Sequence, residues 1–239
     1  MLEQLENRRL LSVTALFQPK TGVLTVAGDE NSQEIEVNIF NSPFHRVGTQ
    51  VIVVANGKEL YNVYQTRGDL QRVEIFGAAG DDVIHVFNEA AGVGVVAYGE
   101  RGADQIDSTA AYPAPGSEID GGLGDDTLIL RSFSKINPAG HFAQGGPGND
   151  LIYGSSGSDV LWGDMADGKL AGNDSIYGGM GNDMIYGGDG DDMLFGDEGN
   201  DVIDAGAGSD FVDGGAGEDV GIVDGFDKYD GLEKLVLLE

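Results

Sequence analysis

The sequence predicts an all-β fold in which short strands stack as the coils of a solenoid. The strongest observation is a nine-residue repeat that fills residues 145–222, apart from one interruption. Its copies include GGPGNDLIY, GGMGNDMIY and GGDGDDMLF, with glycine first or second, glycine again fourth, aspartate sixth and an apolar residue usually eighth. Upstream, β-forming residues alternate from Val13 to about Tyr98, with no helical periodicity of useful length. A nine-residue unit cannot bury its apolar residue alone, so stacked copies are expected.

Each repeat divides into a turn followed by a short strand. The glycines allow backbone conformations with positive φ, and the three residues after the aspartate (LIY, VLW, MLF) are strand formers. The middle residue of such a strand faces opposite to its two neighbours. We therefore predict a thin aliphatic core made of Ile152, Leu161, Ile176, Ile185, Leu194, Ile203 and Val212.

The nonapeptide resembles the G-G-x-G-x-D-x-U-x unit of the RTX proteins, also called hemolysin-type calcium-binding repeats. The tandem copies between Gly145 and Ile222 carry this resemblance. It implies a right-handed parallel β-helix or β-roll in which several calcium ions lie between stacked turns.

The sixth-position aspartate can be followed through most of the chain. If two nonapeptides make one coil, alternate aspartates lie on opposite edges of the solenoid, and a few intervals of 22 or 24 residues mark longer coils. The first edge then carries Asp82, Asp104, Asp126, Asp150, Asp174, Asp192 and Asp210. The second edge carries Asp159, Asp183, Asp201 and Asp219.

These aspartates are the candidate metal ligands. Stacked coils place equivalent carboxylates about 4.8 Å apart, where they repel each other unless a cation lies between them. Calcium accepts six to eight oxygen ligands in flexible geometry, whereas magnesium requires tighter octahedral geometry. The resemblance implies that turn carbonyls complete each site, and we expect at most nine inter-turn ions, with carbonyl ligands near Gly146, Gly148, Gly179, Gly181, Gly188, Gly190, Gly199 and Gly208.

The composition agrees with a calcium-binding protein and disfavours other classes. The chain has 41 acidic and 13 basic residues and a formal net charge of −28, which disfavours nucleic acid and anionic membranes as partners. Cysteine is absent, which excludes disulfides and thiolate metal sites. No apolar run is long enough for a transmembrane helix, and no signal-peptide pattern begins the chain, so we expect secretion, if it occurs, to use another route.

We expect four parts along the chain. Residues 1–19 form an N-terminal segment in which 1–12 could be a short helix that caps the first coil, and in which 5–11 resembles the LEPR-x-LL segment of some bacterial surface and secreted proteins, with Asn7 in place of proline. Residues 20–144 form a solenoid with long coils and acidic turns on one edge. Residues 145–222 form the RTX β-roll with two nonapeptides per coil. Residues 223–239 form a C-terminal cap or a secretion tail.

Two irregularities interrupt the repeat. Aligning residues 28–37 with 77–86 pairs Ile35 with Ile84 and puts Gln33 in place of Asp82, so this early copy keeps the strand and loses the charged ligand. The insertion at 164–172 enlarges one turn. It is either a tolerated insertion or a recognition loop, and its acids Asp164 and Asp167 could bind an extra ion.

Aromatic residues recur at the ninth repeat position. They could stabilise the sheets as cross-strand ladders, or provide a surface for self-association or glycan binding. The expected residues on one outer face are Tyr153, Tyr177 and Phe195, and those on the other are Trp162 and Tyr186.

The leading functional hypothesis is a non-catalytic, calcium-binding β-solenoid, secreted or at the cell surface, that serves as a structural or interaction module. The alternative is a polysaccharide lyase or epimerase, or a carbohydrate-binding module, on a β-helix scaffold. Uronate chemistry needs cations beside the carboxylates, but Lys169 is the only Lys or Arg between residues 137 and 227. Upstream, Arg72, Glu74 and His85 could face outward together, but we favour ordinary surface positions for these residues.

Overall fold

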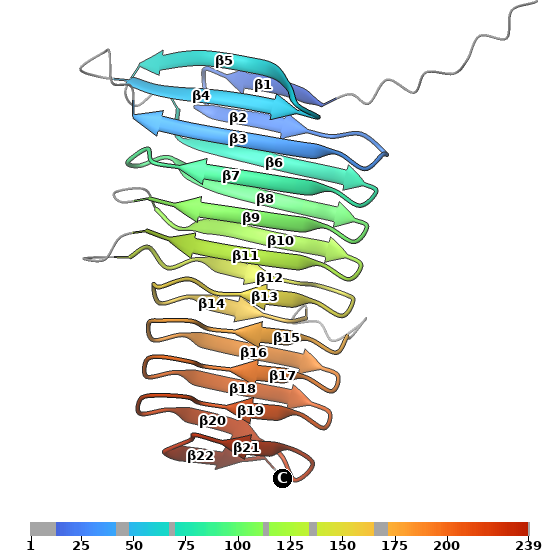
Figure 1. Cartoon of the computed structure of the whole chain (residues 1–239), viewed down its shortest axis with the longest axis vertical. Helices are drawn as coiled ribbons and strands as arrows, with labels where there is room; N and C mark the ends of the chain where they lie inside the picture. The colour runs from blue at the N-terminus through green and yellow to red at the C-terminus, as the bar shows by residue number, and fades with distance from the viewer. Residues whose placement is uncertain are drawn as a thin grey trace, which may run out of the picture.

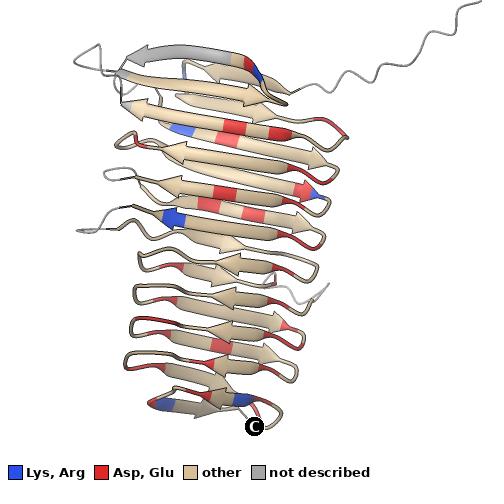
Figure 2. Ribbon diagram, viewed as in Figure 1, with Lys and Arg blue, Asp and Glu red and all other residues tan. Residues whose placement is uncertain are grey.

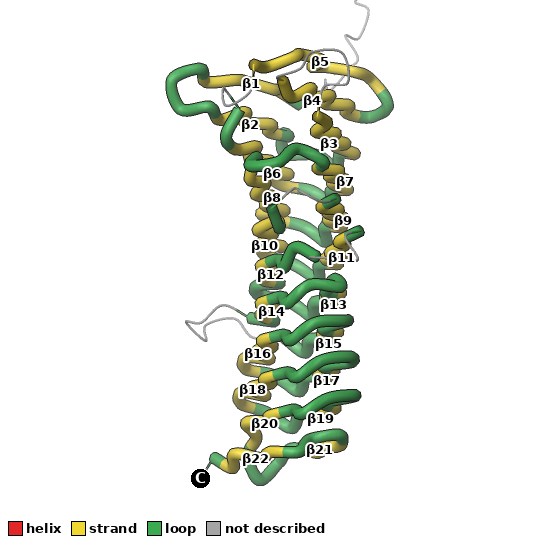
Figure 3. The backbone as a smooth tube through the Cα atoms, turned by 90° about the vertical axis from the view of Figure 1, so that its left-hand side faces the viewer, coloured by secondary structure: helices red, strands yellow, loops and turns green. Residues whose placement is uncertain are grey.

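The chain folds as a parallel β-solenoid. A computed structural model describes residues 13–41, 48–66, 70–111, 115–133, 138–164 and 172–238. Its described residues form strands and turns and no helix. Two long sheets face each other, and the chain crosses between them at each turn (Figures 1 and 3). The predicted fold class is confirmed.

The first sheet, sheet A, contains every second strand of the solenoid. Within it the strands from β2 to β22 pair in parallel. Their order is β1 (Thr14–Gln18), β2 (Val23–Ala27), β6 (Arg72–Ala79), β8 (Gly94–Arg101), β10 (Ser117–Leu123), β12 (Phe142–Gln144), β14 (Val160–Trp162), β16 (Met184–Asp189), β18 (Val202–Ala207), β20 (Val220–Val223) and β22 (Lys234–Leu237).

The second sheet, sheet B, contains the alternate strands. They pair in parallel from β3 to β21. From the N-terminal end the order is β5 (Lys58–Thr66), β4 (Gly48–Ala55), β3 (Glu34–Asn41), β7 (Val83–Asn88), β9 (Gln105–Ala110), β11 (Thr127–Ser132), β13 (Leu151–Tyr153), β15 (Ser175–Tyr177), β17 (Met193–Phe195), β19 (Phe211–Asp213) and β21 (Lys228–Asp230).

The core lies between the two sheets and becomes thinner along the chain. All seven aliphatic residues predicted to point inward from the nonapeptide strands are fully buried. Upstream strands are longer and bury more residues each; β3, for example, buries Ile35, Val37 and Ile39. The C-terminal coils therefore bury little apolar surface. Their turns must contribute the remaining stabilisation of the stack.

Antiparallel strands end both sheets on the N-terminal side. β1 pairs antiparallel with β2, and β3, β4 and β5 form an antiparallel meander (Figure 1). The parallel stack begins at β2 and β3, where Ile35 pairs with Ile84 as the sequence alignment predicted. The helix expected over 1–12, and the segment 5–11, lie outside the described residues.

At the C-terminal end, β21 and β22 are the last strands of the two sheets. Leu232 and Leu235 pack against the core, whereas Val236 and Leu238 are exposed. The described residues contain no helix long and apolar enough to cross a membrane.

Candidate metal centre

The eleven aspartates predicted as ligands lie in the turns at the two edges of the solenoid. Those of the first edge directly precede strands of sheet B, and those of the second edge directly precede strands of sheet A. Acidic residues recur there on successive coils (Figure 2). Their side chains are buried, with exposed fractions between 0% and 2%. A charged residue buried at this level requires a compensating partner.

Each aspartate bonds to its neighbour in the preceding coil. One carboxylate oxygen, Oδ1, accepts a hydrogen bond from the backbone N–H of the preceding aspartate, at 2.7–2.8 Å in all nine cases. The structure therefore brings together every pair of neighbours that the sequence intervals assigned to an edge. On the first edge the pairs are 82–104, 104–126, 126–150, 150–174, 174–192 and 192–210, and on the second they are 159–183, 183–201 and 201–219.

The other carboxylate oxygen has no such partner. In ten of these eleven aspartates Oδ2 is buried and accepts no hydrogen bond from the described residues. The exception is Asp159, whose Oδ2 accepts a bond from the backbone N–H of Ser155, at 2.5 Å. An unsatisfied buried carboxylate oxygen is costly, so a column of them indicates that a cation belongs beside them.

Glycine leaves space for that cation. A Cβ added to Gly77 would lie 2.6 Å from Asp82 Oδ2 and 2.7 Å from the carbonyl oxygen of Gly99 in the next coil. Gly178 on the second edge has the same surroundings, with Asp183 Oδ2 at 2.6 Å and the Gly196 carbonyl oxygen at 2.7 Å. A carboxylate oxygen and a carbonyl oxygen thus point to the space that the missing side chain leaves.

The turn glycines near which carbonyl ligands were expected also have the required backbone. All eight have positive φ, between 98° and 158°. The described residues contain no group of three or more His, Cys, Asp or Glu side chains arranged for a metal ion. The oxygens that surround the first-position glycines are carboxylate and backbone carbonyl oxygens, which are hard donors that suit calcium.

Burial raises the pKa of these carboxyls from the usual 3.8, and the charges of neighbouring aspartates add to the effect in most of them. Hydrogen bonds from the backbone oppose the shift without cancelling it. The pKa rises to about 8 for Asp150, Asp174 and Asp183, to about 7 for Asp82, Asp126 and Asp192, and to about 6 for Asp159, Asp201 and Asp210. Asp104 and Asp219 shift in the same direction. At pH 7 the carboxyls with a pKa of about 8 therefore hold a proton most of the time unless a cation replaces it, whereas those with a pKa of about 6 are mostly ionised.

The first edge begins with a neutral residue. Gln33 occupies the position of the ladder aspartate, and its backbone N–H donates to Asp82 Oδ1 at 2.7 Å. Its side-chain Nε2 donates to Asp29 Oδ1 and to the Asn31 carbonyl, both at 2.6 Å. The amide group satisfies this turn internally, and the copy keeps its strand without the charged ligand, as the sequence alignment indicated.

The second edge also begins with a neutral residue. The backbone N–H of His141 donates to Asp159 Oδ1 at 2.6 Å, and His141 Nδ1 accepts a bond from the backbone N–H of Ser117 at 3.0 Å. Burial lowers the pKa of His141 to about 4, so the imidazole is neutral near pH 7.

Sequence reasoning missed two residues that end the ladders. Asp227 Oδ1 accepts from the backbone N–H of Asp210 at 3.0 Å, and Glu233 Oε2 accepts from that of Asp219 at 2.9 Å. They follow their neighbours by 17 and 14 residues, which breaks the nine-residue period. Only the acidic side chain itself could have indicated them.

The ninth-position aromatics form ladders on the outer faces. Tyr177 stacks with Tyr153 at 5.1 Å between ring centroids and with Phe195 at 4.8 Å, and Trp162 stacks with Tyr186 at 4.2 Å. Each ring covers the face of its neighbour, which stabilises the stacked strands.

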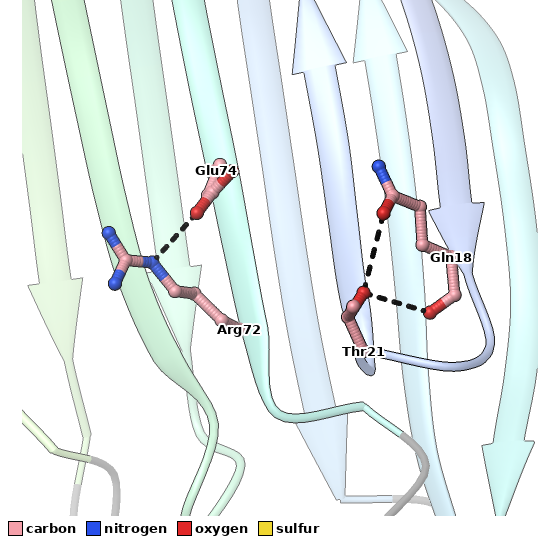
Figure 4. A network of polar contacts seen from close by, with 4 residues as sticks. All are labelled: Gln18, Thr21, Arg72 and Glu74. Carbon is pink, nitrogen blue, oxygen red and sulfur yellow. Dashed lines mark hydrogen bonds and ion pairs between the residues drawn. The ribbon is translucent and has the colours of Figure 1, made fainter.

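The outward group expected upstream is divided between the sheets. Arg72 Nε lies 3.1 Å from Glu74 Oε1 on β6 of sheet A, close to the turn in which Thr21 donates to Gln18 (Figure 4). His85 lies on β7 of sheet B. The less favoured alternative, in which the three residues face outward together, is wrong because β6 and β7 belong to opposite sheets.

Comparison with protein families identifies the repeat. The model of the RTX calcium-binding nonapeptide repeat matches residues 118–131, 142–168, 170–194 and 186–220. The chain carries RTX calcium-binding repeats. It is therefore a calcium-binding repeat protein, and its RTX repeats, which bind Ca²⁺ between turns, fold as a β-roll. The matched segments stop short of Asp82 and Asp104, whose turns lack the full motif although they continue the same ladder. A search of curated proteins found no match.

Proposed function

We propose that the chain is a secreted or cell-surface β-solenoid that folds with calcium and serves as a non-catalytic structural or interaction module. The observation that carries this proposal is the column of buried Oδ2 atoms without hydrogen-bond partners along both edges. A cation shared by neighbouring aspartates would remove the cost of these buried oxygens, so we infer that calcium is a structural element of the fold.

The proposed ligands are the eleven ladder aspartates together with carbonyls of the glycine turns. Neighbouring aspartates form six pairs on the first edge and three on the second, which allows at most nine ions. The pair formed by Asp159 and Asp183 is the weakest candidate, because Ser155 already donates to both oxygens of the Asp159 carboxylate. When bound, the ions neutralise the aspartates and link each coil to the next.

An extracellular location is supported by the chemistry of the sites. RTX-repeat proteins are typically secreted, and extracellular calcium modules commonly bind with dissociation constants of roughly 10⁻⁴–10⁻³ M. Such sites would be filled outside the cell and largely empty in the cytosol, which would couple folding to export.

A non-catalytic role is supported by the separation of Arg72 and Glu74 from His85. Arg72 with Glu74, and His85, lie on different sheets and cannot form one acid–base site. The stacked aromatics support sheet stabilisation more than glycan binding, because the ring faces that a sugar would cover lie against one another.

The experiment is a calcium titration of the full chain after chelation, followed by circular dichroism. We expect the β-sheet signal to increase between micromolar and millimolar calcium, and magnesium at the same concentrations to have little effect. A spectrum that does not change over this range would contradict the proposal.

A further inference from the structure

The enlarged turn that begins at Gly163 differs from its neighbours at its second position. In other turns, the space that a Cβ would occupy on the second-position glycine is bordered by the second-position carbonyl of the preceding coil. Gly146 meets the Gly122 carbonyl in this way, and Gly206 meets that of Gly188. At Gly188 the nearest group is instead the side chain of Asp164, with Cβ at 2.6 Å and Oδ2 at 2.8 Å. A carboxylate thus takes the place of a backbone carbonyl in one coil.

The Asp164 carboxylate is buried and only half satisfied. The residue is 4% exposed. Its Oδ2 accepts a hydrogen bond from the backbone N–H of Asp189 at 3.1 Å, while its Oδ1 is buried without a hydrogen-bond partner among the described residues. The negative charge of Asp164 acts on Asp174 and Asp192, the two ladder aspartates of the adjoining turns. A buried carboxylate with one unpartnered oxygen thus lies within electrostatic reach of a ladder pair, and a cation shared with that pair would satisfy it.

We propose that Asp164 is an additional calcium ligand, for the ion held between the turn that starts at Gly163 and the turn at 187–192. This inference rests on the proposed function. Within the described residues no three acidic or histidine side chains already surround a common point. The carboxylate of Asp164 must therefore move toward Asp174 and Asp192 when the ion binds, so that it joins their site rather than forming a separate cluster.

The ion at this site would therefore have one more negatively charged ligand than the ions between the other pairs of ladder aspartates. Calcium affinity in proteins increases with the number of charged ligands. The site at Asp164 is therefore the tightest of the chain and the first to fill. It fixes one turn in the middle of the acidic column, from which neighbouring coils can order in both directions.

The chain contains a probe for this site. Trp162, its single tryptophan, lies two residues before Asp164 at the end of β14. Terbium ions replace calcium at oxygen sites, and a nearby tryptophan sensitises their emission. The full chain is titrated with terbium while it is excited at the red edge of the tryptophan band, where tyrosine does not absorb.

We expect tryptophan-sensitised emission from the unmodified chain to saturate before the circular dichroism change is complete. In Asp164→Asn the half-saturation concentration should rise about tenfold, because the ion loses one charged ligand while the bond from Asp189 is kept. Asp189→Asn is the matched control: it removes the same charge from an exposed side chain of the adjoining turn and should leave the half-saturation within about twofold.

Asp164→Gly is the second variant, because it restores the consensus glycine and keeps the fold if the asparagine variant fails to form it. It should show the same weakened site with calcium-dependent folding intact. Equal half-saturation in the unmodified chain and either Asp164 variant would overturn the inference and leave the proposed function standing. No terbium or calcium binding by the unmodified chain would overturn the proposed function itself.

Discussion

The sixth-position aspartate performs two tasks with its two oxygens. Oδ1 accepts the backbone N–H of the preceding coil and sets the spacing of the turns, and Oδ2 remains available for a cation. Asparagine could perform the first task through its amide oxygen, but its neutral side chain would bind calcium less strongly. Because one side chain performs both tasks, aspartate recurs along both edges of the C-terminal coils and along the first edge upstream.

At this scale the raised pKa values predict a pH dependence. The folded, calcium-free chain keeps protons on carboxyls whose pKa is about 6 to 8, whereas the unfolded chain releases them near the usual 3.8. The free energy of unfolding without calcium should therefore fall as the pH rises from the unfolded value, about 4, to the highest folded value, about 8. Calcium displaces the protons, so its affinity should increase over the same window and level off above about pH 9.

Calorimetric calcium titrations in buffers of different ionisation enthalpy measure the released protons directly. We expect proton release near pH 7 and almost none near pH 9. A binding heat near pH 7 that is the same in every buffer would show that the aspartates are already ionised.

Among single residues, the ladder aspartates could be predicted from the sequence because their spacing with glycine is regular. Gln33 was also predictable, since the apolar residues after it align with the next copy. Asp227 and Glu233 were not predictable, because the chain returns to the edge after irregular intervals. The burial of Asp164 could not be deduced, since the insertion at 164–172 breaks the nine-residue period.

The repeating structural unit of the C-terminal part is the coil, which consists of two short strands and two glycine turns. A three-residue strand buries one aliphatic side chain, so the turn contributes as much to order as the strand does. The first-position glycine is needed for space: the φ of Gly178 lies outside the left-handed region, but a Cβ there would meet two oxygens of the ion site.

Gly178→Ala should consequently weaken calcium-dependent stability. The added methyl group lies 2.6 Å from Asp183 Oδ2, and overpacking of this kind costs about 1–3 kcal/mol. Urea unfolding in saturating calcium measures the loss. Gly225→Ala is the matched control, because no atom lies within 4 Å of its added Cβ, and its free energy of unfolding should change by less than about 0.5 kcal/mol. Equal stability of the two variants would show that the space beside Gly178 has no function.

At the scale of elements, the alternation of β-formers predicted strands but could not distinguish coils from hairpins. The turn at Asn56-Gly57 is one example. Both residues have positive φ and they join the antiparallel strands β4 and β5, whereas a solenoid turn would have led to the opposite sheet. Strand pairing depends on contacts distant in sequence, which local alternation does not encode.

The whole molecule changes its source of stability along its length. The N-terminal coils have strands of five to nine residues, antiparallel strands at their end and a neutral Gln33 turn. The C-terminal coils have strands of three to six residues and acidic turns on both edges. Apolar burial therefore decreases toward the C-terminus while the density of candidate calcium sites increases. The net charge of −28 is acceptable in a compact chain only if cations offset much of it.

The most direct test of the central claim is an anomalous scattering map from crystals grown in calcium. Two columns of peaks should lie along the edges, between successive coils, each peak beside the Oδ2 atoms of ladder aspartates. An ordered structure in which those oxygens bind only water or protein donors, with no anomalous peak between the coils, would contradict the claim that calcium holds this solenoid together.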